Sequence, residues 1–165
     1  MIIWLASYPK SGNTWMWFFI KSYFNPPNKK FSLNHDKDDP YLLETFPTQK
    51  RFKQLNIKYD DFLDLSKNWI NLQSFINLNN KTNYLKTHNA MCTVNNNKFT
   101  DIKNTKGAIH IVRDPRDVLV SYSSYKSENI DKTLEILLSD NSYEYANFEE
   151  KRYKRSLMGS WASHY

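Results

Sequence analysis

Residues 8–15 read YPKSGNTW and follow directly on the apolar run IIWLAS at residues 2–7. A short apolar run that ends in a turn predicts a strand buried on both faces of a sheet. Residues 14–24 are apolar on nearly every side, which predicts a buried helix. Gly12 is one of only three glycines in the chain, and it lies between this strand and this helix. The stretch therefore predicts a strand–loop–helix unit with a loop that curves tightly at a glycine.

Such a unit is a good site for an anion. The first N–H groups of a helix lack intrahelical acceptors, and the helix dipole favours negative charge there. Lys10 adds a full positive charge, and Ser11 and Thr14 add hydroxyl donors. A nucleotide-triphosphate loop needs GxxxxGK[ST], whereas here the lysine precedes the only glycine of the loop. We expect a P-loop-like site for a phosphate-like ligand other than ATP or GTP; the alternative is a plain strand-to-helix turn with a surface lysine.

Two further apolar stretches predict strands, YLKT at 84–87 and GAIHIV at 107–112. Asp114 and Pro115 follow the second of them as an N-cap and a first helical residue. The other expected elements are two short helices within 59–78, helices over 115–126, 130–138 and 148–164, and loops over 28–50 and 92–106. Strands that alternate with helices predict the α/β class, with a parallel β-sheet flanked by helices. Ligands of such sheets bind at the carboxyl ends of the strands, where all three predicted strands run into polar motifs.

Composition excludes several classes of protein. The net charge of +6 favours anionic ligands, but no dense basic tract is present, so we expect no nucleic acid as a partner. No apolar run approaches the roughly 20 residues of a membrane span. The chain has one cysteine, Cys92, and no export signal, which predicts a cytoplasmic location. No metal-ligand motif is present, and we expect no metal.

Three segments resemble, in the same order, those of sulfotransferases that use 3′-phosphoadenosine 5′-phosphosulfate (PAPS). YPKSGNTW at 8–15 resembles the 5′-phosphosulfate loop of that family, and LKTH at 85–88 resembles the stretch with its catalytic histidine. IVRDPRDVLVSY at 111–122 resembles the segment that binds the 3′-phosphate. GSWASH at 159–164 is similar to a fourth, less specific segment. The resemblance spans residues 1–165, in which 25–80 match only as a spacer.

The resemblance implies roles for the loop residues. Lys10 would contact the oxygens around the breaking bond and stabilise the leaving phosphate. Trp15 would lie against the adenine, although a core tryptophan is the alternative. Asn13 stands where threonine is frequent in animal members of the family, a change that a backbone contact tolerates. The residues expected to hold the 5′-phosphate are Ser11, Gly12, Asn13 and Thr14.

The resemblance also implies roles for residues of the segments at 85–88 and 111–122. His88 would be the general base that takes the acceptor proton, and a structural histidine is the alternative. Lys86 lies on the same side of the strand by period-two alternation and would stabilise the transferring group. Arg113 and Ser121 would hold the 3′-phosphate. For His110, in the middle of its strand, we expect a place in the core.

Two further expectations concern the charged residues next to Arg113 and the extent of the domain. Asp114, Arg116 and Asp117 are expected to serve in capping and local ion pairs. Members of the family usually continue beyond a GSWASH-like segment to a late Arg-Lys-Gly segment that completes the nucleotide site. We therefore expect residues 1–165 to form a single sulfotransferase domain, truncated or naturally minimal, and a homo-oligomer stays open.

Three functions remain open from the sequence. The first is PAPS-dependent transfer of a sulfuryl group to the hydroxyl or amine of a small-molecule acceptor, whose identity the sequence does not indicate. The second is a module that binds the 3′-phosphoadenosine nucleotide without turnover. The third is a kinase-like enzyme of nucleotide triphosphates, which the position of Lys10 disfavours.

Overall fold

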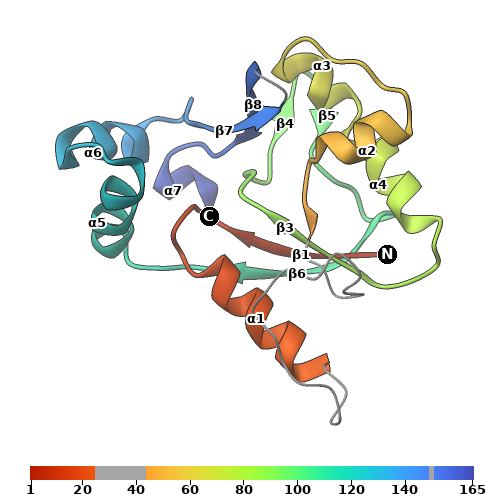
Figure 1. The fold of residues 1–165 in the computed structure, drawn as a ribbon, viewed down its shortest axis with the longest axis horizontal. Helices are drawn as coiled ribbons and strands as arrows, with labels where there is room; N and C mark the ends of the chain where they lie inside the picture. The colour runs from red at the N-terminus through yellow and green to blue at the C-terminus, as the bar shows by residue number, and fades with distance from the viewer. Residues whose placement is uncertain (25–43, 149–150) are drawn as a thin grey trace.

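The computed structural model describes residues 1–24, 44–148 and 151–165. In these residues a parallel sheet of four strands has the order β2-β3-β1-β6 (Figure 1). The strands are β1 (Ile2–Ser7), β2 (Glu44–Thr45), β3 (Asn83–Thr87) and β6 (Thr105–Ile111). Helices flank the sheet, so the expected α/β class with a parallel sheet is confirmed.

Strand β1 is buried on both faces because its side chains alternate between two groups of helices. Trp4 points to one face and packs in a cluster with Trp69 of helix α4 (Trp69–Asn77). Leu5 points to the opposite face and packs with Trp17 of helix α1 (Asn13–Phe24). This burial explains why the strand is a continuous apolar run.

The predicted helix after the loop is confirmed, but its burial all round is wrong. The face of α1 that includes Trp17 and Ile20 is buried against the sheet. Phe19 and Tyr23 are exposed on another face of the helix. An apolar run that satisfies helix periodicity on one face can still carry aromatic side chains on the others, and sequence alone does not tell how many faces are covered.

Most of the remaining helices follow the expectation. The two short helices within 59–78 are α3 (Phe62–Lys67) and α4, and the later pair are α5 (Pro115–Lys126) and α6 (Ile130–Leu138). The expected loop 28–50 lies outside the described residues as far as 43, and the rest of it contributes β2 and the start of α2 (Gln49–Gln54). The expected loop 92–106 holds a small hairpin of β4 (Thr93–Val94) and β5 (Asn97–Lys98).

The expected helix over 148–164 is wrong. The chain instead forms an antiparallel hairpin of β7 (Tyr143–Phe148) and β8 (Lys151–Leu157), followed by the short helix α7 (Trp161–His164). Polar residues at every second position, Arg152, Lys154 and Ser156, suit a strand, but Arg155 between Tyr153 and Leu157 interrupts this period-two pattern.

The β7–β8 hairpin is tied to the end of β3. The Leu157 amide donates to Oδ1 of Asn89 at 2.8 Å, and the Ala90 amide donates to the Leu157 carbonyl at 2.8 Å. Asn89 is buried, so its side chain joins two segments far apart in the sequence. These bonds bring the hairpin to the edge of the sheet where β3 ends (Figure 1).

The carboxyl ends of three parallel strands meet at that same edge. Ala6 of β1 is aligned with Thr87 of β3 and with His110 of β6. The residues that follow these strands are therefore neighbours in space, as expected for ligand sites of parallel sheets.

The expected burial of His110 in the core is wrong. Its side chain is exposed and lies beside the ring of Tyr165, with 4.7 Å between the ring centroids. Strand β6 is at the edge of the described sheet, and alternate residues along it are exposed. Successive side chains of a strand lie on opposite faces of the sheet, and the face of β6 that carries Lys106, Ala108 and His110 is open to solvent.

Candidate functional site

The loop at 8–15 makes a tight turn between β1 and α1. Gly12 has φ 108° and Lys10 has φ 69°, both in the left-handed region. Only glycine adopts the Gly12 conformation without strain, which accounts for a glycine at this position. The Lys10 carbonyl accepts a hydrogen bond from Nη1 of Arg113 at 3.1 Å, so the end of β6 supports the loop.

Asn13 fixes the start of α1 against the sheet. Its side chain is 3% exposed, and Nδ2 donates to the Leu5 carbonyl at 2.8 Å and to Oγ of Ser7 at 3.1 Å. The Nδ2 donor of Asn13 is thus occupied with the sheet, which leaves the backbone N–H as the donor that this residue can offer to a ligand of the loop. The hydroxyl of Ser11 lies 3.1 Å from that of Tyr165.

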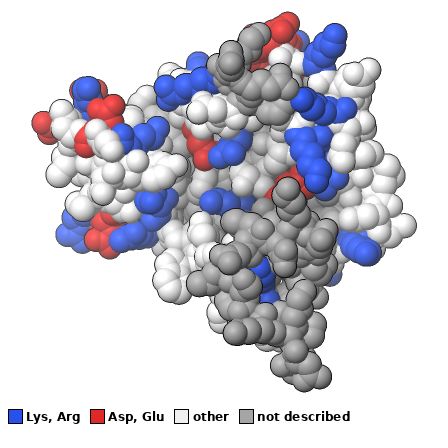
Figure 2. All heavy atoms as spheres, viewed as in Figure 1, with Lys and Arg blue, Asp and Glu red and all other residues white. Residues whose placement is uncertain are grey.

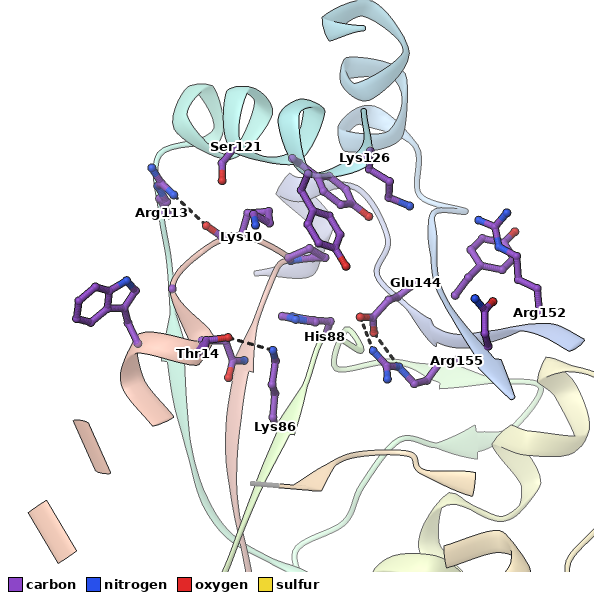
Figure 3. Close-up of a pocket in the computed structure, with 18 residues that line it drawn as sticks. Lys10, Thr14, Lys86, His88, Arg113, Ser121, Lys126, Glu144, Arg152 and Arg155 are labelled. Carbon is purple, nitrogen blue, oxygen red and sulfur yellow. Dashed lines mark hydrogen bonds and ion pairs between the residues drawn. The ribbon is translucent and has the colours of Figure 1, made fainter. Parts of the chain in front are cut away.

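A cavity of about 880 Å³ opens beside the loop (Figure 3). Of the site residues predicted from the sequence, all but Ser11 line it. They are Lys10, Gly12, Asn13, Thr14, Trp15, Lys86, His88, Arg113 and Ser121. The structure therefore brings residues of three separate sequence segments to one cavity.

Trp15 lies at the cavity, and the charged residues near Arg113 form ion pairs. Trp15 is 81% exposed at the cavity, which excludes the alternative of a core tryptophan.

The expected capping and ion pairs at the start of α5 are confirmed. Asp114 accepts from the Arg116 amide at 2.9 Å and pairs with its guanidinium, while Asp117 lies 3.6 Å from Nε of Arg113.

His88 is buried with one nitrogen committed to the backbone. It is 7% exposed, and Nδ1 lies 2.7 Å from the Ser7 carbonyl. Since a carbonyl only accepts, Nδ1 carries the proton and Nε2 has a free lone pair. Burial lowers the pKa of His88 to about 4, although the nearby carboxylate of Glu144 opposes the shift. At neutral pH the ring is uncharged and able to accept a proton.

This lowered pKa predicts that the protein loses stability in acid. The ordinary pKa of 6.5 applies to the unfolded chain, and the folded value is about 4. Between these values the unfolded chain binds the extra proton, so the contribution is complete above 6.5 and lost as the pH falls towards 4. We expect a loss of up to about 3 kcal/mol in the free energy of unfolding between pH 7 and pH 4.

Urea unfolding at a series of pH values measures this loss. Because the effect originates at His88, the variant His88→Asn should lose less stability over the same range. An equally steep decline in that variant would assign the acid sensitivity to other groups, such as His164, whose pKa burial also lowers.

Lys86 lies between the loop and His88. Its Nζ is 3.5 Å from Oγ1 of Thr14, and both residues line the cavity (Figure 3). Burial lowers the pKa of Lys86, and the carboxylate of Glu144 opposes this shift. Lys86 and His88 line the same cavity, as the alternation along the strand predicts.

The β7–β8 hairpin supplies a wall of the cavity that was not predicted from the sequence. Arg155 donates from Nε and Nη2 to the two carboxylate oxygens of Glu144, at 3.1 and 2.5 Å. Burial alone would raise the pKa of Glu144, but the charges of His88, Arg155 and Lys86 lower it below its ordinary value. With His88 neutral, Arg155 and Lys86 keep this carboxylate ionised at neutral pH.

Arg152 and Arg155 were missed because a helix was expected over 148–164, and for residues 139–147, which include Glu144, no element was expected. The interrupted period-two pattern at 152–157 was a weak local signal for a strand there. The further cavity residues without an earlier prediction are Pro9, Tyr122, Tyr125, Lys126, Tyr145, Asn147 and Arg152.

A tight loop at the carboxyl edge of a parallel sheet, with cations and a neutral histidine around one cavity, is the arrangement of α/β proteins that bind phosphate-bearing ligands. The family comparison is more specific. The family model described as "Sulfotransferase domain" matches residues 2–165, and the chain belongs to this family. A search of curated proteins finds no match. The family supports sulfuryl transfer to an acceptor as the general activity.

In residues 1–24, 44–148 and 151–165, no group of three or more His, Cys, Asp or Glu side chains is placed to hold a metal ion. None of the helices in the described part of the chain is long and apolar enough to cross a membrane.

Proposed function

We propose that this protein transfers a sulfuryl group from PAPS to the hydroxyl or amine of an acceptor molecule. The observation that carries the proposal is the convergence of loop 8–15, His88 and Arg113 on one cavity. The start of α1 and Lys10 would hold the 5′-phosphosulfate, because helix N-termini and lysines both favour phosphate oxygens. Arg113 and Ser121 would hold the 3′-phosphate.

The chemistry follows from these positions. The acceptor oxygen or nitrogen attacks sulfur, and the bond from sulfur to the 5′-phosphate oxygen breaks, which releases 3′-phosphoadenosine 5′-phosphate (PAP). His88 takes the acceptor proton on Nε2, its free nitrogen, and passes it to solvent. Lys10 and Lys86 stabilise the negative charge that develops around sulfur and the leaving phosphate. As in phosphoryl transfer, most of the rate gain comes from positioning and electrostatics.

Binding of PAP against adenosine 5′-phosphate tests the proposal. At 100 times its dissociation constant, PAP should stabilise the protein by about 2.7 kcal/mol. This corresponds to a rise of roughly 5–10 °C in Tm for a chain of this size. Adenosine 5′-phosphate lacks the 3′-phosphate, so the same concentration should give a much smaller shift. The variant Arg113→Gln should weaken PAP binding about tenfold or more and weaken binding of adenosine 5′-phosphate much less, by the loss of its hydrogen bond to the Lys10 carbonyl.

Arg116→Gln is the matched control, because Arg116 is exposed and pairs with Asp114 outside the cavity. Equal shifts with the two nucleotides would contradict the role of Arg113. A larger shift with ATP than with PAP would favour the kinase-like alternative. Tight binding of PAP without transfer to any acceptor would favour the binding module.

A further inference from the structure

The cavity has two ends that differ in chemistry. Figure 3 shows Lys10 and Thr14 on one side of His88, and Glu144 and Arg155 on the other. If the nucleotide lies at the loop, as proposed above, the acceptor must approach His88 from the hairpin side. A volume of about 880 Å³ is near the upper end of the ~300–1,000 Å³ usual for small-molecule pockets, which leaves room for both molecules.

Two cations stand at the hairpin end, Lys126 from α5 and Arg152 from β8 (Figure 3). Among the residues that the structure describes, neither forms an ion pair with a carboxylate. Arg155 differs from them, because it is neutralised by Glu144. The Lys126–Arg152 pair therefore contributes positive charge that no described acidic side chain cancels.

Aromatic rings support both members of this pair. The guanidinium carbon of Arg152 is 4.3 Å from the centroid of the Tyr145 ring, and Nζ of Lys126 is 5.3 Å from that of Tyr122. Such contacts hold a cation in place while leaving its N–H donors available. Asn147, which is paired with Arg152 across the hairpin, adds an amide to the same wall.

The β7–β8 hairpin departs from regular pairing at this wall. The register shifts between Glu144 and Tyr145, so that Tyr145 is aligned with Lys154 and Glu144 with Ser156. Arg155 is the extra residue of this irregularity. In a regular strand Arg152 and Arg155 would point to opposite faces, whereas here both line the cavity.

We propose that the acceptor is a hydroxylated acid, with a carboxylate or sulfate bound by Lys126 and Arg152 and a hydroxyl presented to His88. A purely apolar alcohol would have no group to pair with these cations, of which Lys126 is half-buried and Arg152 is exposed at the cavity. An anion satisfies them through charge-assisted hydrogen bonds. Figure 2 shows Lys and Arg side chains spread over separate parts of the viewed face and not gathered in one basic tract.

The inference rests on the proposed function and is tested by calorimetric titration of the protein saturated with PAP. The probes form two matched pairs, which distinguish a sugar acid from an aromatic acid. They are methyl β-D-glucuronide with methyl β-D-glucoside, and 4-hydroxyphenylacetate with its amide. We expect the acid of at least one pair to bind about tenfold more tightly than its neutral partner.

Variants assign the preference to the pair. Arg152→Gln and Lys126→Gln should each reduce the preference for the acid about three- to tenfold, with unchanged affinity for PAP. Lys154→Gln is the matched control, because Lys154 is on the same strand and does not line the cavity. Equal affinities for acid and neutral probe in both pairs would overturn the inference, and so would a variant that weakens PAP itself to the same degree.

Failure of the proposed function is distinguishable from failure of the inference. If the wild-type protein does not bind PAP, the proposed function fails. The same probes are then titrated without nucleotide. A preference for the acid that Arg152→Gln abolishes would still support an anion site at the hairpin, and no preference would overturn it.

Discussion

Replacement of His88 by asparagine is expected to lower kcat for sulfuryl transfer by about 10²- to 10⁴-fold, the usual contribution of a general base. The affinity for PAP should remain, because His88 lies beyond the residues proposed to hold the nucleotide. Asparagine keeps an N–H donor for the Ser7 carbonyl, which now accepts from Nδ1 at 2.7 Å. The variant therefore removes the free Nε2 with little change in the support of the loop.

The measurement is a single-turnover assay with labelled PAPS, with His110→Asn as the control. His110 is a histidine of the neighbouring strand β6 that does not line the cavity. A loss of less than about tenfold in the His88 variant, or a similar loss in the control, would contradict the role of His88 as base.

The dependence of the rate on pH gives a second measurement of the same role. Burial lowers the pKa of His88 to about 4, and only the neutral ring can take a proton. In the wild type, kcat/KM should therefore stay constant from pH 7 to about 5 and fall below that value. A fall centred near 6.5 would mean that the ring is not buried during turnover.

The strand–loop–helix unit could be predicted from the sequence because every physical requirement is local. The apolar run at 2–7, the single glycine of the loop and the apolar helix after it each specify their own conformation. Parallel pairing then brings the carboxyl ends of β1, β3 and β6 together whatever lies between them. The positions of Lys10, His88 and Arg113 around one cavity follow from this topology.

The hairpin wall could not be predicted in the same way. Local preference over 148–164 was ambiguous, and the strands form because β7 and β8 pair with each other and because Asn89 binds the Leu157 amide. These contacts join residues distant in sequence, so a local pattern does not contain them. The exposure of His110 is a similar case, since it depends on which face of β6 other elements cover.

The Glu144–Arg155 ion pair of the hairpin affects the pKa of His88. Glu144 is negatively charged near the ring, and its field alone would favour a protonated histidine. Arg155 balances that charge through two hydrogen bonds. Burial is the main cause of the lowered pKa of His88, and the charge of Arg155 adds to it by opposing the effect of Glu144.

Arg155→Met should accordingly destabilise the protein by about 2–5 kcal/mol, the usual cost of removing one partner of a buried charge pair. The side chains of Arg155 and Glu144 are only 22% and 19% exposed, so water cannot replace the lost hydrogen bonds fully. Urea unfolding at pH 7.5 measures the loss. The double variant with Glu144→Gln should recover much of it, because no uncompensated charge then remains inside the cavity wall.

Arg116→Gln provides the matched comparison, since its ion pair with Asp114 is at the surface, with Arg116 89% exposed. Surface pairs contribute roughly 0–1 kcal/mol, so this loss should be several times smaller than that of Arg155→Met. Equal losses in the two variants would mean that solvent screens the Glu144–Arg155 pair. A double variant no more stable than Arg155→Met alone would mean that the aliphatic packing of Arg155, and not the unpaired carboxylate, accounts for the loss.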